Sequence, residues 1–334
     1  MRSVRTLLMI AVGAANAATP FATAKIARLA RALGAELELF HCVYKPSIAR
    51  RGRISMRGIE KEILDLVGES RVWLEAMAKP LRAEGLKVHT AARWDEPTND
   101  GIVRQAMRHK PDLLVAQSAR RSRIARLMLS QTDYRLIETC PCPLLLIKTA
   151  RPYGNGPIVA AIDPTHARDK PAALDSSILD AASVLSRRLS APLHVVHVCT
   201  PWEQMIAESK KLRRIPVLQK LEIHKMYLQC TDIQVRELVG RHGVTGAQVY
   251  VVEGEASKAL ASFSRHVSAD VVVMGAVSRS AFNRVVIGHT AEQVLDMLDA
   301  DLLIVKAPSF RSPVAPQMNH RLPSGRARRA KSIS

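Results

Sequence analysis

Short apolar runs alternate with longer amphipathic stretches along most of the chain. In the second half the expected strands are 157–162, 193–199, 248–252, 270–274 and 302–306, and the expected helices are 172–189, 221–242, 256–267 and 290–299. The runs DVVVMG and DLLIVK are apolar throughout, which is typical of strands that are covered on both faces. Strands separated by helices of this length predict an α/β fold with a parallel, doubly wound sheet.

This layout occurs twice in the sequence. Residues 112–148 align without gaps with residues 270–306, with nine identical positions among 37 and a constant offset of 158. The starts of the halves also correspond, since LLMIAVG (7–13) parallels PIVAAID (157–163). The stretch RPYGNGP between the halves has the Pro and Gly residues of a linker. We therefore expect two repeated domains, residues 1–150 and 151–308.

The N-terminal stretch MRSVRTLLMIAVGAANAATP allows two interpretations. Its basic start, apolar run and Ala15-Asn16-Ala17 resemble a secretory signal with a cleavage site. The alternative is a first buried strand, Thr6 to Val12, which would remain in a cytoplasmic protein. We favour the strand, because the second repeat has the same layout. No apolar run is long enough to predict a membrane span.

Charge is the unusual feature of the composition. Lys and Arg total 49 against 30 Asp and Glu, which gives a net charge of +19. This balance favours nucleic acid or another polyanion as a partner, or an anionic membrane surface; a basic solvated surface without a dedicated partner is the equal alternative. Residues 309–334 carry six basic residues and no acid, which predicts a disordered basic tail. Three further basic clusters are Arg50, Arg51, Arg53 and Arg57; Arg120, Arg121, Arg123 and Arg126; and Lys210, Lys211, Arg213 and Arg214, the first two of them expected in loops.

The cysteines and histidines give little sign of a metal site. Five cysteines without paired spacing do not predict a disulfide framework, so we expect them to fill the core in a reducing compartment. Cys140-Pro-Cys142 lacks the second pair of ligands that zinc requires. His197 and Cys199 alternate on one expected strand and are more simply explained by packing or backbone contacts. The common phosphate-loop, dinucleotide, zinc-protease and serine-hydrolase motifs are absent.

One loop has features of an anion site. In an open α/β sheet, ligands bind beyond the carboxyl ends of the strands where strand order reverses, which here would bring the segments after Ile162 and after Met274 to one crevice. Gly275 and Gly288 would let backbone N–H groups approach a phosphate, and Thr290 begins a capping box. The alternatives are an ordinary strand-to-helix connection and an Asp163 that only stabilises its turn.

The segments VVVMGAVSRSAFNRVVIGHTAEQVLDMLDADLLIVK and CPCPLLLIK resemble the universal stress proteins. Together with the duplication, they make the chain similar to the tandem members of this family, the UspE type. The resemblance implies two five-stranded, adenine-nucleotide-hydrolase-like domains. It also implies that each closing strand, 143–148 and 301–306, lies at a sheet edge that mediates dimerisation in the family. We therefore expect the two repeats to form an intramolecular pseudo-dimer.

The ATP-binding members of the family carry Gly-x2-Gly-x9-Gly-Ser/Thr and an acidic residue at the end of the first strand. By this resemblance, the cofactor-binding candidates are Asp163, Val198, Gly275, Ser278, Arg279, Gly288, His289 and Thr290. Ser278 replaces the middle glycine, and His289 stands where a small hydroxyl residue would follow Gly288. The corresponding positions of the first half are Gly13, Gln117, Arg120 and Ser130, so the whole fingerprint has changed there.

These features lead to three functional hypotheses. The preferred one is a non-enzymatic, cytoplasmic stress-response protein that binds ATP or another anion weakly, and only in the second half, with no catalytic or metal-binding residue. The second is a nucleic-acid-associated protein acting through its basic surface and tail. The third is a slow ATPase that uses the loop from Gly275 to Thr290, which lacks a convincing general base.

Overall fold

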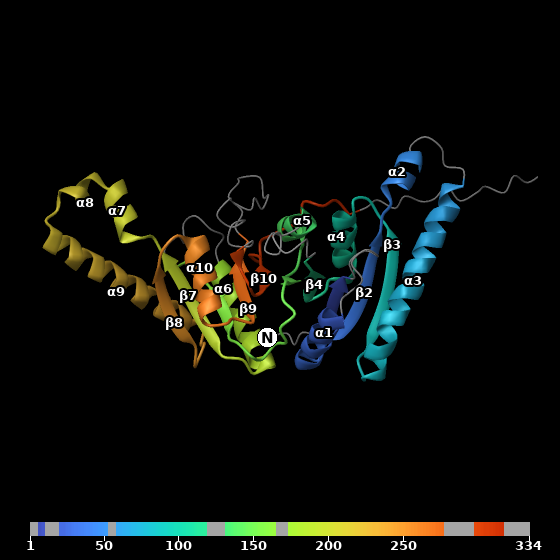
Figure 1. Cartoon of the computed structure of the whole chain (residues 1–334), viewed down its shortest axis with the longest axis horizontal. Coiled ribbons are helices and arrows are strands. Elements are labelled where there is room, and N and C mark those ends of the chain that lie inside the picture. Colours follow the sequence, from blue (N-terminus) through green and yellow to red (C-terminus); the bar gives the residue numbers. More distant parts are fainter. Residues whose placement is uncertain are drawn as a thin grey trace, which may run out of the picture.

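The computed structural model describes residues 6–10, 20–52, 58–118, 131–164, 173–276 and 297–316 (Figure 1). The first half contains β1 (Thr6–Ile10), α1 (Pro20–Leu33), β2 (Glu36–Val43), α2 (Pro46–Gly52), α3 (Ile59–Ala83), β3 (Val88–Trp94), α4 (Thr98–His109), β4 (Leu113–Gln117), α5 (Gln131–Thr139) and β5 (Leu144–Ile147). The second half contains β6 (Ile158–Ala161), α6 (Leu174–Leu189), β7 (Leu193–Cys199), α7 (Trp202–Glu208), α8 (Lys210–Arg214), α9 (Val217–Arg241), β8 (Gln248–Glu253), α10 (Ala256–His266), β9 (Val271–Gly275) and β10 (Asp301–Val305).

The described strands form one sheet in the order β3-β2-β1-β4-β5-β10-β9-β6-β7-β8. Within each half the five strands are parallel, as predicted. The halves join through the two closing strands, which pair antiparallel with Leu145 opposite Leu303. The expected pairing of these edges within one chain is therefore confirmed. Each edge covers the other, which removes two apolar strand edges that would invite aggregation.

The first strand lies in the interior of its half. β1 pairs with β2 on one side and β4 on the other, so the prediction of a strand from Thr6 is confirmed. Its expected end at Val12 falls outside the described residues. Cleavage after Ala17 would remove this strand and leave β2 and β4 without their common partner.

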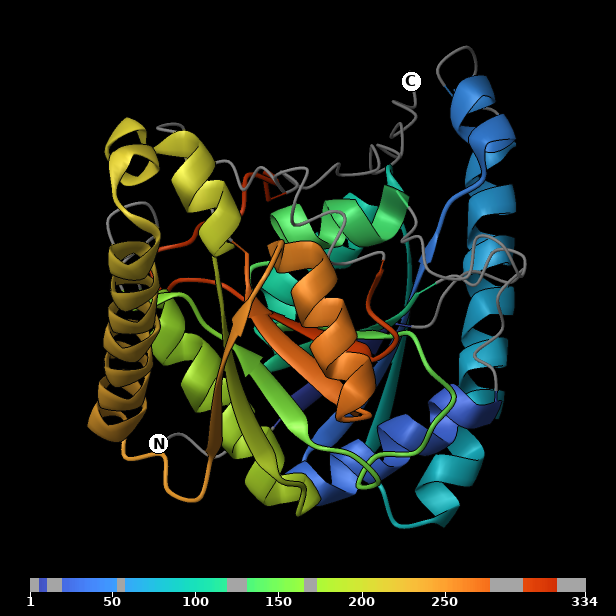
Figure 2. The same cartoon turned by 60° about the vertical axis from the view of Figure 1, so that its left-hand side comes forward.

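Helices cover both faces of the sheet and produce two hydrophobic cores. One core joins α1, α3, α6 and α9 to the strands, and the other joins α4, α5 and α10 to them. Figure 2 shows the second half with α10 on one side of the strands and α6 and α9 on the other. Both cores contain side chains from both halves, for example Leu29 and Leu179 in the first core. The two repeats thus share continuous cores as well as a sheet.

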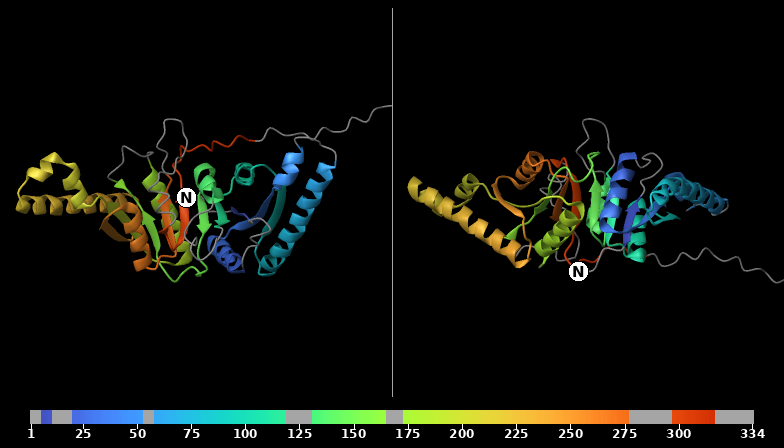
Figure 3. Two further views of the ribbon diagram at one scale, coloured as in Figure 1. Left: turned by 45° about the horizontal axis from the view of Figure 1, so that its top comes forward. Right: turned by 90° about the horizontal axis from the view of Figure 1, so that it is seen from below.

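Two helical arms extend from opposite ends of the sheet (Figures 1 and 3). One consists of α2 and α3, and the other of α7, α8 and α9. Arg50 and Arg51 therefore belong to a helix, not to the expected loop; the run from Lys210 to Arg214 forms α8. Ser209 caps α8 by accepting the Leu212 N–H at 3.2 Å.

The helix expected from 221 begins four residues earlier, at Val217. Val217, Leu218 and Leu221, at the start of this helix, are exposed. The apolar residues there do not follow the helical spacing of a buried face, so the sequence pattern did not reveal the first turn. Pro216 sets the start of the helix instead. Within the described part of the chain, no helix combines the length and apolar character that crossing a bilayer requires.

The segment after β10 is packed against the first half. Val314 is buried in the core of α4 and α5, and Ala315 accepts a hydrogen bond from Arg104 Nε at 3.2 Å. Phe310 lies under the Lys306 ammonium, 3.9 Å from Nζ to the ring centroid. The expectation of disorder is therefore wrong for residues 309–316, because a few apolar side chains find sites that composition does not reveal. Residues 317–334 lie outside the described part.

Candidate functional site

Strand register brings three of the candidate residues to one edge of the second half. β6 pairs with β9 so that Ala160 lies opposite Val273, and with β7 so that Ala161 lies opposite Val196. Continuing this register by two residues places Ile162 level with Gly275, and Asp163 level with Val198. This edge is the carboxyl end of adjacent parallel strands at the point where strand order reverses, the usual position of a ligand site in such sheets.

Asp163 and His197 form the polar part of this edge. The His197 ring is buried; its Nδ1 lies 3.1 Å from the Ile162 carbonyl oxygen and 3.7 Å from Asp163 Oδ1. This agrees with the expectation that His197 pairs with backbone. The Asp163 side chain is 44% exposed, so its carboxylate can accept hydrogen bonds from hydroxyl or amino groups of a ligand. Val198 is half-buried beside it and packs against the core of α10.

Gly275 is required by packing. A Cβ at this position would lie 2.7 Å from Leu174 Cδ2 and 2.8 Å from Leu174 Cγ, at the first residue of α6. The same helix start is held to the edge by Asp175, whose Oδ1 accepts the Asp163 N–H at 3.2 Å. The sequence analysis missed both contacts, although an acid in the first turn of a helix was a visible signal. The close approach of α6 thus explains this glycine without any ligand.

The other second-half candidates, Ser278, Arg279, Gly288, His289 and Thr290, lie outside the described residues. So do Gly13, Arg120 and Ser130 of the first half. Gln117 ends β4 at the corresponding edge of the first half, where Ser118 Oγ donates to the buried Asp133 at 2.8 Å. In the described part of that edge, the Ser118 and Asp133 side chains therefore hydrogen-bond to each other.

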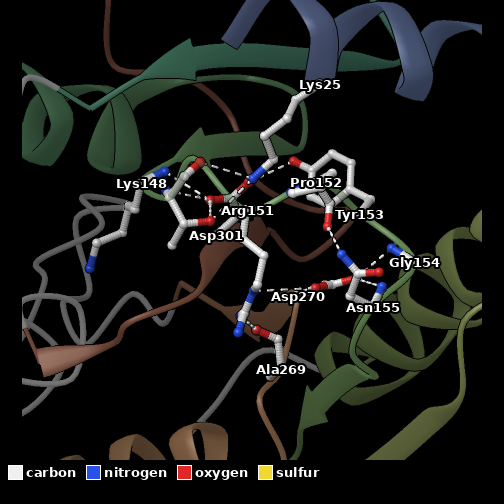
Figure 4. A network of polar contacts seen from close by, with 11 residues as sticks. Lys25, Lys148, Arg151, Pro152, Tyr153, Gly154, Asn155, Ala269, Asp270 and Asp301 are labelled. Carbon is white, nitrogen blue, oxygen red and sulfur yellow. Dashed lines mark hydrogen bonds and ion pairs between the residues drawn. The ribbon is translucent and has the colours of Figure 1, made fainter. Parts of the chain in front are cut away.

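A second polar cluster lies where the halves meet, and the sequence analysis missed it (Figure 4). Asp301, at the start of β10, is fully buried. Its carboxylate accepts hydrogen bonds from Lys25 Nζ at 2.5 Å, Tyr153 Oη at 2.7 Å and the N–H groups of Lys148 and Thr149, both at 2.9 Å. Its donors come from α1 and from the linker after β5, so one carboxylate holds the first half to the second.

A second carboxylate continues this cluster. Asp270, just before β9, accepts the N–H groups of Gly154 at 2.6 Å and Asn155 at 3.1 Å. Arg151 Nε lies 3.6 Å from Asp270 Oδ1. The linker that looked like a plain turn is therefore fixed by two buried acids, each of which begins or precedes an apolar strand.

Burial sets the protonation states of this cluster. Burial lowers the pKa of Lys25, and the charge of Asp301 opposes that effect. Burial and the same carboxylate raise the pKa of Tyr153 well above its usual value, so the phenol stays protonated and donates. With its oxygens occupied by protein donors, Asp301 suits the joining of two domains and not the binding of a substrate.

The described residues show no group of three or more His, Cys, Asp or Glu side chains able to hold a metal ion. Cys42, Cys140 and Cys199 are buried as expected, and Cys142 is partly exposed. The expectation of a core position is wrong for Cys230, which is exposed on α9, whose buried residues are Thr231, Val235 and Val239.

Comparison with known proteins identifies both repeats. The profile of the universal stress protein family matches residues 8–148 and 155–306. Universal stress protein E of Escherichia coli K12 is 22% identical over 252 residues, which cover 75% of this chain and 78% of the relative. The Universal stress protein E homolog of Haemophilus influenzae is 19% identical over 213 residues, covering 64% of this chain and 68% of the homolog.

Solved structures share the fold over most of the chain. A functionally unknown protein from Pseudomonas aeruginosa PAO1 has a TM-score of 0.65 at 23% identity, covering 91% of this chain and 93% of its own. A universal stress protein from Archaeoglobus fulgidus has a TM-score of 0.61 at 14% identity, covering 90% and 98%. At these identities the structures support the fold alone.

Proposed function

The chain belongs to the universal stress protein family as a tandem of two repeats, and we propose that it is a non-enzymatic stress-response protein whose second half binds ATP, another adenine nucleotide or a similar anion weakly. The observation that carries this proposal is the asymmetry of the two carboxyl edges. The second half has the half-exposed Asp163 carboxylate at this edge, whereas the first half has Gly13 at the corresponding position of its sequence. The five cysteines, all in the free thiol form, favour the reducing cytoplasm.

Two substitutions support weak binding. Ser278 adds a Cβ to a loop position where the family's ATP-binding members have glycine, and His289 replaces a small hydroxyl residue. Each lost hydrogen bond to a charged phosphate costs about 1.5–3 kcal/mol, or roughly a tenfold or greater loss of affinity. A dissociation constant near the cellular concentration of ATP would suit a sensor.

The proposal that the protein is not an enzyme rests on the side chains at the described carboxyl edge of the second half. Asp163 and the buried His197 are the titratable pair there, and the His197 ring is directed at the Ile162 carbonyl and the Asp163 carboxylate. A slow ATPase that uses the loop from Gly275 to Thr290 ranks behind simple binding, because no residue in 274–292 is a convincing general base.

The bound molecule can be sought directly in the purified protein. Because weakly bound nucleotide is lost on purification, the purified protein is dialysed at low salt against millimolar ATP, and the nucleotide held in excess of the free concentration is measured. We expect an adenine nucleotide in the wild type and in Asp180→Asn, an exposed acid on α6, and less in Asp163→Asn. Equal amounts in the Asp163 and Asp180 variants would place the ligand elsewhere.

Polyanion binding is the second candidate, and the α7–α9 arm favours it. α8 exposes Lys210, Lys211, Arg213 and Arg214 at the end of the molecule, in a chain of net charge +19. Phosphate contacts release counterions, so the affinity for a duplex should fall steeply as salt rises. We expect Lys210→Gln with Lys211→Gln to reduce the salt slope more than Arg187→Gln with Arg188→Gln on α6. Equal effects of the two pairs would mean a diffuse attraction without a site.

A further inference from the structure

Two thiols lie close together in the loop between α5 and β5. Cys140 follows the last turn of α5 and donates its N–H to the Leu136 carbonyl at 2.9 Å. Cys142 is two residues further on, and the two Sγ atoms are 3.6 Å apart, within hydrogen-bonding distance for sulfur. Cys140 is buried and Cys142 is partly exposed, so a small oxidant would approach the pair from the side of Cys142.

The second repeat shows that this loop does not need sulfur to pack. At the offset of 158, Leu298 and Ala300 occupy the positions of Cys140 and Cys142, and both are fully buried. The loop before β10 is therefore filled by ordinary apolar side chains. The two loops therefore occupy equivalent places in the fold and differ in chemistry, because only the loop of the first repeat carries thiols.

A cation from the other half lies against the pair. Lys306, just after β10, donates from Nζ to the Cys140 carbonyl at 2.9 Å. Burial lowers the pKa of Lys306 to about 8, so it still carries most of its charge at neutral pH. The loop with the two thiols is thus in direct contact with the second half.

The neighbours favour a shared proton between the sulfurs. Burial raises the pKa of the Cys140 thiol, but hydrogen bonds from the Cys142 side chain and backbone, together with the Lys306 charge, hold that pKa below its usual value. The pKa of Cys142 is raised well above its usual value by its bond to Cys140 and by burial. A thiol next to a thiolate is the state from which oxidation proceeds.

We propose that Cys140 and Cys142 form an oxidisable dithiol, which hydrogen peroxide or a related peroxide converts to a disulfide at the junction of the two repeats. The Cys140 thiolate attacks one peroxide oxygen while the shared proton stays on Cys142. The O–O bond breaks, Cys140 becomes a sulfenic acid, and the departing hydroxide takes up a proton from solvent and leaves as water. Cys142 then displaces the sulfenic hydroxyl, which leaves with the Cys142 proton as a second water.

The step balances without another reactant. Counted from two protonated thiols, the pair loses two protons and two electrons, and the peroxide gains them to give two waters. The sulfurs must approach from 3.6 Å to about 2.05 Å, so the loop has to shift. Because this loop carries the carbonyl that Lys306 binds, oxidation acts on a contact between the halves.

A single tryptic peptide reports the reaction. Cleavage after Arg135 and Lys148 releases residues 136–148, which contain Cys140 and Cys142 and no other cysteine. The folded full-length chain is treated with hydrogen peroxide, and the remaining thiols are alkylated after denaturation. The chain is then digested with trypsin, and the peptide masses are measured by mass spectrometry. We expect this peptide to be lighter by two hydrogens and unlabelled, and to regain both labels after dithiothreitol. The proposal would be overturned if Cys140 and Cys142 both remained labelled in a sample in which the exposed Cys230 had been oxidised. Irreversible oxidation of one of the two sulfurs would also overturn it.

Matched variants separate the pair from the other thiols. Cys142→Ala gives the loop the residue that the second repeat has at this position, and Cys230→Ser removes an exposed thiol far from it. Peroxide should shift the melting temperature of the wild type and of Cys230→Ser, and leave that of Cys142→Ala unchanged. A peroxide shift that persists in Cys142→Ala, or that disappears in Cys230→Ser, would contradict the assignment.

Discussion

Lys25, on α1 of the first repeat, donates a hydrogen bond to Asp301, at the first residue of β10 in the second repeat, and both side chains are buried. The closing lysines add a symmetric pair of contacts. Lys148 Nζ donates to the Leu298 carbonyl at 2.7 Å, and Lys306 Nζ to the Cys140 carbonyl at 2.9 Å. At the repeat offset of 158, the two lysines correspond to each other, and so do Cys140 and Leu298. Asp301 corresponds to Pro143, which has no carboxylate, so the first repeat has no equivalent of the ion pair. The junction is therefore a symmetric dimer contact to which one asymmetric ion pair has been added.

The first prediction concerns this ion pair. Asp301→Asn removes the charge that compensates Lys25 and should lower the free energy of unfolding by about 3–5 kcal/mol. Replacing both residues, Lys25→Met with Asp301→Asn, should recover part of the loss, because no buried charge is left unpaired. Urea unfolding of the full-length chain measures both. Asp232→Asn, in the exposed pair with Arg236, is the control and should cost less than about 1 kcal/mol. A loss no larger than that of the control would show that the pair is not needed.

The second prediction concerns the paired edges. Residues 1–150 and 151–310, produced separately, each expose an apolar closing strand that β5–β10 pairing covers in the whole chain. We expect each half to self-associate or aggregate at micromolar concentration, and mixing during refolding to restore a soluble one-to-one complex. Sedimentation velocity gives the answer. Two soluble, stable monomers would show that neither edge requires cover.

The third prediction separates packing from ligand binding at Gly275. Gly275→Ala puts a methyl group against Leu174 and should cost about 1–3 kcal/mol in unfolding free energy. Leu174→Ala alone leaves a cavity and costs about 2–5 kcal/mol. The double variant should be more stable than the sum of the single losses implies, because the methyl group added by Gly275→Ala occupies part of the space that Leu174→Ala leaves empty. Strict additivity in this cycle would mean that the contact does not explain the glycine.

The fourth prediction concerns pH. Burial lowers the pKa of His41, whose ring packs edge-on against Trp73 at 5.4 Å. In the unfolded chain His41 takes up a proton as the pH falls through 6.5, while the folded chain resists it, so stability is lost below that pH. His41→Phe should flatten the dependence of the unfolding free energy on pH below 6.5. An unaltered slope in His41→Phe would assign the acid sensitivity to other groups, such as His194.

Much of this fold could be predicted from the sequence, because strands covered on both faces are almost purely apolar and the unit occurs twice. The expected strand 302–306 differs from β10 by a single residue at each end, and its exposed edge predicted the pairing with 143–148. The repeat also decided between a signal sequence and a strand at Thr6.

The junction could not be predicted in the same way. Asp301 was visible as an acid next to an apolar run, but its partner Lys25 is 276 residues away and no periodicity connects them. Cys140-Pro-Cys142 could be noted as a motif, whereas the approach of Lys306 depends on the fold. At the ligand edge, register explains the placement of Asp163, Val198 and Gly275, but the contact of Leu174 that accounts for the glycine depends on how α6 packs.

The most direct test of the proposed function is calorimetric titration with ATP of the wild type, Gly288→Val and Ser130→Val. The two substitutions change corresponding positions of the two repeats, so each is the control for the other. We predict weak binding in the wild type, no signal in Gly288→Val, since a β-branched residue blocks backbone approach to phosphate, and an unchanged signal in Ser130→Val. Binding that survives Gly288→Val but disappears in Ser130→Val, or no binding of any variant at millimolar ATP, would contradict a nucleotide site in the second half.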